Sequence, residues 1–297
     1  MFREPHHEII VLVNIAFVTS AAHPDLTPDD QLAVVQLEQR SARVTSAVWN
    51  DPSADWTDFD AIIIRSTWDY HHRAEEFRSW IDALDATGAP LWNPPALLRW
   101  NMEKTYLRDL ERAGVPIVPT EWLEQGTNPD LGGLLAERGW AEAVVKPVIS
   151  AAASRTWRVS HSTALEVGAQ LTESLGAGDV MVQPFVREIQ TRGEWSLMFI
   201  DGDFSHAVRK MPTEGDFRVQ TGFGGRSITD DPDSEVVRAA RRVLDAAPSP
   251  WLYARVDGIE TEAGFVLLEL EMLEPSLFFS HTESGAARFA DAIIARV

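Results

Sequence analysis

The run L-L-E-L-E-M near the C-terminus carries two carboxylates, Glu269 and Glu271, inside a stretch that otherwise reads as a buried strand. Alternate residues of a strand share a face, so the two carboxylates point one way, and Leu268, Leu270 and Met272 point the other. One face of this strand therefore belongs to the hydrophobic core, and the other collects negative charge.

A second strand, over residues 252–257, precedes this one and carries a third carboxylate. A three-residue turn at 262–264 sets Asp257 opposite Glu269, with Arg255 on the same face. Two like charges about 4 Å apart repel by roughly 4 kcal/mol at an effective dielectric near 20, so such a cluster is unfavourable without a cation. Hard oxygen ligands favour Mg²⁺. Taken alone, these residues favour a solvated hairpin face on an acidic protein over a Mg²⁺ site.

Lysine is rare in this chain, and its positions are therefore informative. Of 26 basic residues only three are lysines, Lys104, Lys146 and Lys210. Since arginine is used elsewhere, each lysine indicates a position that needs a compact, flexible ammonium group, as contacts to phosphate often do. For any single lysine, retention by chance is the simpler interpretation.

The elements that position these residues begin with an α/β segment. We expect strands at residues 9–19, 43–49 and 61–65, a helix that follows the cap Thr27 and Pro28, and a helix over 75–87 that ends at Gly88. This alternation predicts a parallel sheet. The turn Asn93-Pro94-Pro95 ends a first domain, residues 1–94.

The rest of the chain divides into two further units. Residues 95–185 contain a linking helix over 103–113 and buried strands at 143–147 and 180–185. In residues 186–297 we expect a largely antiparallel sheet, with strands at 195–200, 204–210, 252–257 and 265–272 and helices at 233–246 and 282–296. The predicted fold class is α/β with an α+β C-terminal part, and the carboxylate hairpin belongs to the last unit.

In their order along the chain, these residues resemble the ATP-grasp ligases of the glutathione-synthetase-like subgroup, over nearly the whole chain. No Walker A or strand-linked G-x-G-x-x-G motif is present. The resemblance implies an ATP-grasp fold behind an N-terminal substrate-side domain, with ATP and Mg²⁺ as cofactors. It implies that Lys104, in N-M-E-K-T-Y, and Lys146, in a strand that ends K-P, contact the ATP phosphates. It also implies that the Mg²⁺ ligands are Asp257, Glu269 and Glu271.

The resemblance extends to the rest of the nucleotide and to the reacting groups. The run Q-P-F-V-R-E-I, residues 183–189, resembles the adenine hinge of the family, and R-G-E-W-S resembles the segment whose acid meets the ribose hydroxyls. The glycine-rich segment 214–226 resembles the substrate loop, and the basic residues around it would meet the γ-phosphate, the substrate or the acyl phosphate. The implied residues are Gln183, Pro184, Phe185, Val186 and Glu194 for the nucleotide, and Lys210, Arg218 and Arg255 for catalysis.

Two positions depart from the pattern of the family. The third metal residue is usually Asn, whereas this chain has Glu271, and we expect the extra charge to alter metal affinity. The phosphate-covering loop, often rich in glycine, reads S-A-A-A-S-R-T at residues 150–156. Without glycine this loop has fewer conformations available.

A substrate site is predicted in the first domain, where I-I-I-R-S-T-W-D-Y ends a strand at the edge that α/β sheets use for ligands. Polar residues here and at the end of the neighbouring strand could hold the carboxylate and ammonium groups of an amino acid. The predicted residues are Arg65, Thr67, Asp69, Thr19 and Ser20. A polar loop with Trp68 in the core explains the same residues equally well.

Composition limits the other classes of function. The net charge of −19 disfavours binding to nucleic acid or anionic membranes, so we expect a small, amino-acid-like partner, and a homodimer stays open. The absence of cysteine excludes disulfides and thiolate chemistry. The apolar run 9–18 is too short to span a membrane, and the segment before it lacks the positive charge of a signal peptide, so we expect a cytoplasmic protein. His71 and His72 are expected at the surface.

The expected reaction is ATP-dependent carboxylate–nitrogen ligation through an acyl phosphate, with release of ADP and phosphate. Within the subgroup, the short chain and the run E-L-E-M-L-E-P-S-L-F-F most resemble the cyclo-ligases that close O-ureido-D-serine to D-cycloserine. One alternative is a ligase that joins two separate amino acids or peptides. The other is a nucleotide- or metal-binding protein without turnover.

Overall fold

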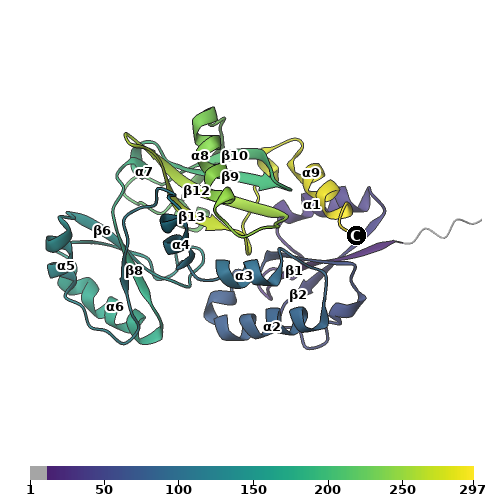
Figure 1. The fold of residues 1–297 in the computed structure, drawn as a ribbon, viewed down its shortest axis with the longest axis horizontal. Coiled ribbons are helices and arrows are strands. Elements are labelled where there is room, and N and C mark those ends of the chain that lie inside the picture. Colours follow the sequence, from purple (N-terminus) through teal and green to yellow (C-terminus); the bar gives the residue numbers. More distant parts are fainter. Residues whose placement is uncertain (1–11) are drawn as a thin grey trace, which may run out of the picture.

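The structure is a computed structural model that describes residues 12–297, so the first residues of the strand expected at 9–19 lie outside it. Three sheets follow one another along the chain (Figure 1). Within the described residues, no helix is long and apolar enough to cross a lipid bilayer.

The first sheet is parallel, as predicted, with strand order β2-β1-β3-β4. Thr27 caps the first helix by accepting a hydrogen bond from the amide of Asp30, and the second helix ends at Gly88 with φ of 69°, as the sequence predicts. The elements are β1 Val13–Thr19, α1 Pro28–Glu38, β2 Ala42–Val48, η1 Trp56–Asp58, β3 Ala61–Ser66, η2 Tyr70–His72, α2 Ala74–Thr87 and β4 Leu91–Trp92.

Two short helices, α3 Pro95–Asn101 and α4 Tyr106–Arg112, replace the single linking helix expected over 103–113. Proline is well tolerated in the first turn of a helix, so Pro95 begins α3 rather than prolonging the turn. The break before α4 occurs where the amide of Lys104 bonds the carbonyl oxygen of Val148, at 3.0 Å, instead of a helical carbonyl. This long-range bond brings Lys104 to the second sheet.

The second sheet is antiparallel and has the order β5-β8-β6-β7. Its edge strand β7 was not predicted. This strand has only four residues and follows the loop 150–156 directly. The elements are β5 Glu121–Leu123, α5 Leu131–Arg138, β6 Glu142–Pro147, β7 Trp157–Ser160, α6 Ala164–Ala177 and β8 Val180–Pro184.

The third sheet is antiparallel, as expected, with the order β11-β10-β9-β12-β13. The short strand β11 was not predicted. The elements are α7 Glu188–Thr191, β9 Glu194–Ile200, β10 Asp203–Met211, η3 Thr221–Phe223, β11 Arg226–Thr229, α8 Ser234–Asp245, β12 Tyr253–Thr261, β13 Gly264–Glu271, η4 Phe279–His281 and α9 Gly285–Ile294.

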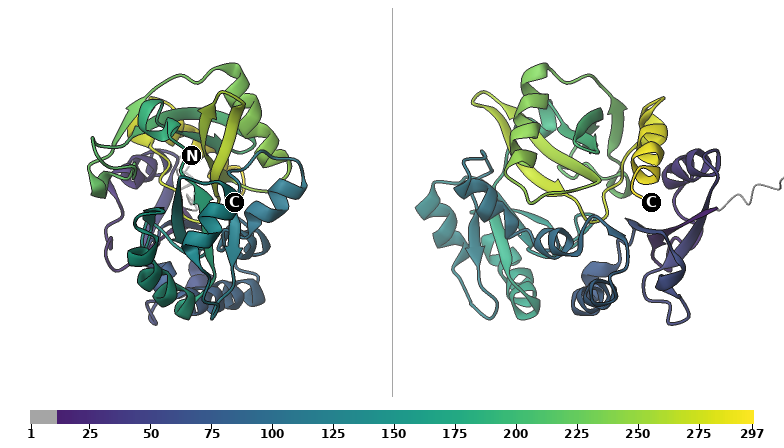
Figure 2. Two further views of the ribbon diagram at one scale, coloured as in Figure 1. Left: turned by 90° about the vertical axis from the view of Figure 1, so that its left-hand side faces the viewer. Right: turned by 45° about the vertical axis from the view of Figure 1, so that its right-hand side comes forward.

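The first and third units share one hydrophobic core. Most buried side chains of the second sheet form another, but Met181 of β8 and the linker helices α3 and α4 pack with the third sheet. Phe17 of β1 packs in the same cluster as Met198 of β9, Tyr253 of β12 and Phe289 of α9, and helix α9 lies beside α1 (Figure 1). The core of the second unit contains only residues between 131 and 182. Figure 2 shows the second unit on the far side of the molecule from the first sheet, with the third sheet across both. The domain boundaries 1–94, 95–185 and 186–297 stay a prediction.

The hairpin of β12 and β13 has a shorter turn than predicted. Thr261 pairs with Gly264, so only Glu262 and Ala263 form the turn, and the three-residue turn expected at 262–264 is wrong. Gly264 has φ of 112°, which a residue with a side chain rarely adopts. A two-residue turn on its own shifts the register of the hairpin by one residue and sends the carboxylates to different faces.

A β-bulge corrects this shift and restores the predicted pairing. Gly258 pairs with Leu267, but the next pair is Asp257 with Glu269, so Leu268 is the extra residue on β13. Leu267 therefore enters the core, and Leu268 is half-buried and lines the cavity described below, contrary to its predicted place on the core face. The carboxylates reach their predicted face through the bulge and not through the turn.

Candidate active site

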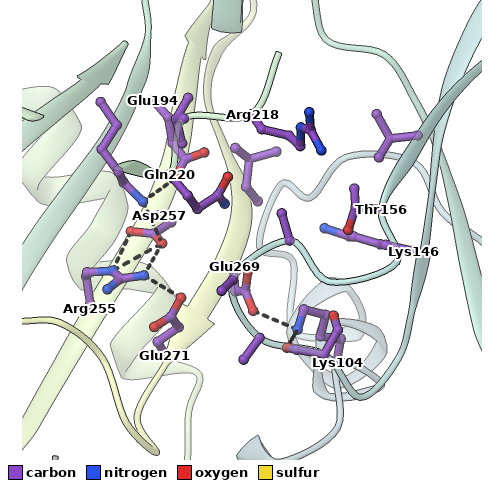
Figure 3. A pocket seen from close by; sticks show the side chains of 18 of the residues that line it. Lys104, Lys146, Thr156, Glu194, Arg218, Gln220, Arg255, Asp257, Glu269 and Glu271 are labelled. Carbon is purple, nitrogen blue, oxygen red and sulfur yellow. Dashed lines mark hydrogen bonds and ion pairs between the residues drawn. The ribbon is translucent and has the colours of Figure 1, made fainter. Parts of the chain in front are cut away.

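A cavity of about 410 Å³ lies where the three units meet. Its lining includes every residue predicted to bind nucleotide or metal or to act in catalysis, but none of the five predicted to bind the substrate. Figure 3 shows the carboxylates and Arg255 on one side and Lys104 and Lys146 on the other. The predicted residues in the lining are Lys104, Lys146, Gln183, Pro184, Phe185, Val186, Glu194, Lys210, Arg218, Arg255, Asp257, Glu269 and Glu271.

Arg255 joins two of the three carboxylates. Its Nε atom lies 3.0 Å from Oδ1 of Asp257, its Nη2 atom lies 2.9 Å from Oδ2, and Nη2 also bonds Glu271. Ser196 donates a further hydrogen bond to Asp257, at 2.5 Å. Burial opposes ionisation of Asp257, but the charges of Arg255 and Lys210 outweigh it and hold the pKa of this carboxyl below its usual value.

Glu271 differs from Asp257 in its electrostatic environment. Burial raises the pKa of Glu271 to about 8: Arg255 opposes the rise, and the carboxylates Glu269 and Asp257 add to it. An additional cation in this space would favour the ionised form. The extra charge that distinguishes Glu271 from the asparagine of the family is therefore poorly compensated in the ligand-free protein.

Lys210 bridges two acids on the same wall of the cavity. Its Nζ atom lies 2.5 Å from Oε1 of Glu194 and 3.3 Å from Oδ2 of Asp257. All three side chains are buried, and β9, β10 and β12 are adjacent strands that position them. Burial lowers the pKa of Lys210, but the charges of Asp257 and Glu194 prevail and raise it, so this lysine stays an ammonium group.

Lys104 and Lys146 differ in their partners. The Nζ atom of Lys104 lies 2.9 Å from Oε1 of Glu269 and 2.7 Å from the carbonyl oxygen of Ser150. Lys146, near the end of β6, forms no ion pair with any acidic residue of the described chain. Burial lowers the pKa of Lys146. An unpaired cation at the end of a strand is suited to receive an anionic ligand.

The three predicted metal ligands are oxygen donors that suit Mg²⁺ in chemical type. Within residues 12–297, no three acidic or histidine side chains already form a metal-binding group, because Arg255 and Lys104 hold the carboxylates in ion pairs. Asp257 and Glu269 are directly opposite on β12 and β13, and Glu271 follows on the same face. This donor set fits a divalent cation once Lys104 releases Glu269.

The predicted adenine hinge, 183–186, lies where β8 ends at the cavity. Its first side chain is fixed, because Gln183 donates to the hydroxyl of Thr120 at 2.9 Å. The amide of Phe185 bonds the carbonyl oxygen of Glu142, and the guanidinium carbon of Arg158 lies 3.9 Å from the centre of the Phe185 ring. The hinge is therefore a pre-formed apolar edge of the cavity.

Two loops border the cavity. In the glycine-poor loop 150–156, three residues with side chains, Ala152, Ala153 and Arg155, have φ between 49° and 55°. This left-handed region disfavours residues other than glycine. In the second loop Arg218 bonds Asp216, with Nη2 to Oδ2 at 2.8 Å, and Arg218 lines the cavity.

The structure uses Arg65 in a way that does not match its predicted role in substrate binding. This side chain is 1% exposed and lies outside the cavity lining. Its Nε atom is 2.9 Å from Oδ1 of Asp30, and its Nη2 atom is 3.0 Å from the carbonyl oxygen of Pro275. The guanidinium donors are thus occupied by α1 and by the segment after β13, so Arg65 joins the first unit to the third.

The four other residues of the predicted substrate site, Thr19, Ser20, Thr67 and Asp69, also lie outside the lining. Thr19 donates to the carbonyl oxygen of His23, and Asp69 accepts a hydrogen bond from the indole of Trp49. His71 is half-buried, with Nδ1 2.8 Å from the carbonyl oxygen of Trp68, so its predicted surface position is wrong. His72 is exposed, as expected.

The residues that do face the cavity from this side were not predicted. They alternate with the predicted ones or follow the metal strand, and they are Trp68, Tyr70, Glu274, Ser276 and Phe278. The interpretation that places Trp68 in the core is therefore also wrong. The run E-P-S-L-F-F carried a signal, since it continues the carboxylate strand with a further acid and aromatic residues.

Two buried asparagines that sequence reasoning missed fix the strand β13. Asn101, at the end of α3, donates to the carbonyl oxygen of Leu270 at 2.8 Å and accepts from the amide of Met272. Asn93 donates to the carbonyl oxygens of Tyr253 and Met272. These bonds satisfy the open edge of the third sheet and set the position of the carboxylates.

Comparison with known proteins agrees with this arrangement. Residues 15–93 match the family model "D-cycloserine synthetase DcsG, N-terminal domain", and residues 134–248 match "Prokaryotic glutathione synthetase, ATP-grasp domain". The cycloserine biosynthesis protein DcsG of Streptomyces lavendulae is 33% identical over 273 residues, which are 87% of this chain and 91% of that protein. The glutathione synthetase of Parasynechococcus marenigrum is 26% identical over 84% of this chain and 74% of its own.

Solved structures show the same relationship. The crystal structure of D-cycloserine synthetase DcsG superposes with a TM-score of 0.86 at 30% identity, covering 95% of this chain and 99% of the other. D-alanine–D-alanine ligase from Bacillus anthracis, complexed with ATP, shares the fold with a TM-score of 0.69 at 14% identity, over 96% and 97% of the two chains.

The fold and the cavity define an ATP-grasp ligase, a class of enzyme that forms carbon–nitrogen bonds and uses ATP and Mg²⁺. Within this class, the chain belongs to the D-cycloserine synthetase family.

Proposed function

We propose that this enzyme is a cyclo-ligase that closes O-ureido-D-serine to D-cycloserine at the expense of one ATP. The observation that carries the proposal is the match of the first unit to the N-terminal domain of D-cycloserine synthetase. This unit supplies Trp68 and Tyr70 to the cavity lining. A match in the ATP-grasp part alone would support ligation in general and not this substrate.

The nucleotide is proposed to bind between the second and third sheets. The adenine ring lies along the hinge 183–186, Glu194 meets the ribose hydroxyls, and Lys104 and Lys146 bind the phosphates. Lys146 has no acidic partner to release, whereas Lys104 exchanges Glu269 for a phosphate oxygen. Asp257, Glu269 and Glu271 would hold Mg²⁺, which when bound neutralises charge on the phosphates.

The chemistry is proposed to take place in two steps. A carboxylate oxygen of the substrate attacks the γ-phosphorus, the bond to the β-phosphate oxygen breaks, and ADP leaves. A nitrogen of the same molecule then attacks the acyl carbon and loses a proton. The bond between the acyl carbon and the phosphorylated oxygen breaks, so inorganic phosphate departs with that oxygen and the other carboxylate oxygen stays as the carbonyl. Arg255, Arg218 and Lys210 stabilise the charge that develops on the transferred group.

Because the nucleophile is part of the substrate, no second amine site is needed, and effective molarity replaces it. With O-ureido-D-serine as the sole organic substrate, mass spectrometry should show a ring product formed in step with ADP. Added amino acids should neither accelerate ADP release nor appear in the product. If ADP appears only when a second amino acid is supplied, the intermolecular ligase takes the place of the cyclo-ligase.

The third alternative, a binding protein without turnover, has less support. Lys104, Lys146 and Arg255 are all present and face one cavity, and a site that has lost activity would often lose one of them. The cytoplasmic location stays a prediction from the sequence, and so does the possibility of a homodimer. The preference for a small molecule over nucleic acid or membrane rests on the net charge of −19.

A further inference from the structure

Glu274 is the one carboxylate of the cavity lining that has no cationic partner in the described part of the chain. Asp257, Glu269, Glu271 and Glu194 each form an ion pair. Glu274 is 7% exposed and lines the same cavity. Its carboxylate accepts a hydrogen bond from its own backbone amide, but it forms no ion pair and no side-chain hydrogen bond with another described residue. A buried carboxyl group in this position lacks a partner that a ligand can supply.

Aromatic residues surround this group. The indole of Trp68 donates to the backbone carbonyl oxygen of Glu274 at 3.0 Å, and Trp68, Tyr70 and Phe278 all line the cavity. Tyr70 is 4% exposed, and its hydroxyl has no hydrogen-bond partner among the described residues. Burial raises the pKa of Tyr70 strongly, and the charge of Glu274 adds to this rise. Both residues line the same cavity.

This part of the cavity is not the proposed metal or phosphate site. Lys104 is a cation whose charge acts on Glu274, but it already bonds Glu269 and the carbonyl oxygen of Ser150. Burial raises the pKa of Glu274 to about 7, against the opposing effect of Lys104 and with a further contribution from Glu269. The carboxyl group is thus only partly ionised near pH 7, and a cation beside it would favour the ionised form.

We propose that Glu274, with the faces of Trp68 and Tyr70, binds the ammonium group of an α-amino-acid substrate. A carboxylate and aromatic faces together are the groups that recognise an alkylammonium ion. Glu274 is three residues beyond Glu271, a span of at most roughly 10 Å, and in an α-amino acid a single carbon separates the ammonium group from the reacting carboxylate. The inference rests on the amino-acid substrate of the proposed function and assigns it a recognition site.

Calorimetry tests this inference without requiring turnover. The wild-type enzyme and the variants Glu274→Gln, Glu274→Asp and Glu262→Gln are titrated in the presence of Mg²⁺ and a non-hydrolysable ATP analogue. The two probes are O-ureido-D-serine and the analogue that has hydrogen in place of the α-amino group. Glu262 is exposed at the tip of the β12–β13 hairpin, so Glu262→Gln removes the same charge away from the cavity.

We expect Glu274→Gln to weaken binding of the amino-acid probe by about 10- to 100-fold, the range of a hydrogen bond to a charged group. Binding of the analogue should stay within about twofold of the wild type, Glu274→Asp should recover part of the loss, and Glu262→Gln should behave as the wild type. Unfolding temperatures of all variants establish that the fold is intact.

Four outcomes would overturn the inference. Glu274→Gln binds the amino-acid probe as the wild type does, it loses both probes equally, the wild type does not distinguish the probes, or the wild type binds neither. The ring-product assay reports separately on the proposed function. Unchanged ring formation by Glu274→Gln, with unchanged affinity, would leave the cyclo-ligase standing and reject the ammonium site. If Glu274→Gln selectively loses affinity for the amino-acid probe but the wild type forms no ring product, the ammonium site stands and the cyclo-ligase is rejected.

Discussion

Lys104 and Glu269 form an ion pair across the cavity, with 2.9 Å between Nζ and Oε1, whereas Lys146 on the same side pairs with no acidic residue between 12 and 297. The ion pair joins the linker before α4 to the metal strand β13. The two lysines that the sequence assigns to the same role therefore differ in what they contribute to the ligand-free fold.

Replacing each lysine by methionine should separate these contributions. Lys146→Met should abolish ATP turnover and change the free energy of unfolding by less than about 1 kcal/mol, because no ion pair is lost. Lys104→Met should also abolish turnover but cost about 1–3 kcal/mol, because Glu269 loses its partner. ADP release and denaturant unfolding measure the two effects. ADP release at the wild-type rate from Lys146→Met would contradict the assignment of the phosphate site.

The three carboxylates should respond unequally to removal of their charge. Asp257→Asn should be the most damaging, because Asp257 bonds both Arg255 and Lys210. Glu269→Gln should raise the Mg²⁺ concentration needed for half-maximal activity, and Glu271→Asn should be mildest, because it relieves a crowded carboxylate and introduces the residue usual in the family. Mg²⁺ titrations of ADP release measure the order, and a larger loss in Glu271→Asn than in Asp257→Asn would show it to be wrong.

Arg65→Met should act on stability and not on substrate affinity. Breaking the buried pair with Asp30 leaves an uncompensated carboxylate, which costs about 3–5 kcal/mol, and the carbonyl oxygen of Pro275 loses a donor. Denaturant unfolding should show this loss, and the variant that stays folded at low temperature should keep a KM for substrate within about threefold of the wild type. A large rise in KM at unchanged stability would instead restore the predicted role in substrate binding.

The pH dependence of stability should reveal Glu274. Its pKa is raised from 4.5 to about 7 in the folded protein, so between these values the folded state holds more protons than the unfolded state. Stability from this group therefore falls as pH rises through the window, by at most about 1.4 kcal/mol per pH unit, and is constant above it. Glu274→Gln has no carboxyl group to titrate at this position. The free energy of unfolding of this variant, minus that of the wild type, should therefore increase from pH 5 to pH 7.

Denaturant unfolding without nucleotide or metal, at pH 5, 6, 7 and 8, measures this difference. Glu262→Gln is the matched control and should run parallel to the wild type across the range. A difference between Glu274→Gln and the wild type that stays constant with pH would show that the carboxyl group titrates normally.

Glycine should be accepted in the loop 150–156 at the left-handed positions alone. Ala153 has φ of 55°, so Ala153→Gly should be neutral or stabilising by up to about 1 kcal/mol, since it relieves backbone strain but adds freedom to the unfolded chain. Ala151 is not among the residues with positive φ, and Ala151→Gly should destabilise by a similar amount. Equal effects of the two substitutions on the unfolding temperature would argue against strain in this loop.

The residues predicted to bind nucleotide and metal line the cavity and those predicted to bind the substrate do not, and the physical reason differs from residue to residue. Alternation along β13 identified Glu269 and Glu271 because strand periodicity is local. The pairing of Asp257 with Glu269 was predicted correctly, but from a wrong turn length. The shorter turn is compensated by the bulge at Leu268, and no residue type in the run G-F-V-L-L-E predicts a bulge there.

The five residues predicted to bind the substrate lie outside the cavity lining, and the contacts that place them there are long-range. The position of Arg65 at a strand end suggested a ligand, but Asp30 and Pro275, which are 35 and 210 residues away, occupy its donors. Likewise, Asn101 holds Met272 across 171 residues, and no local pattern distinguishes such an asparagine from one in a loop. A strand-end rule identifies the right edge of the sheet but not which side chains face the cavity.

The core shared by the first and third units has a consequence for how the cavity is built. Phe17, Met198, Tyr253 and Phe289 pack together, so the first sheet and the wall that carries Asp257 form one packed body. Most buried side chains of the second sheet form a cluster of their own, but Met181 of β8 packs into the core of the third sheet. The strand that leads into the predicted hinge is therefore anchored to the wall that carries Asp257 by apolar contacts, and truncation of Met181 would loosen both sides of the nucleotide pocket at once.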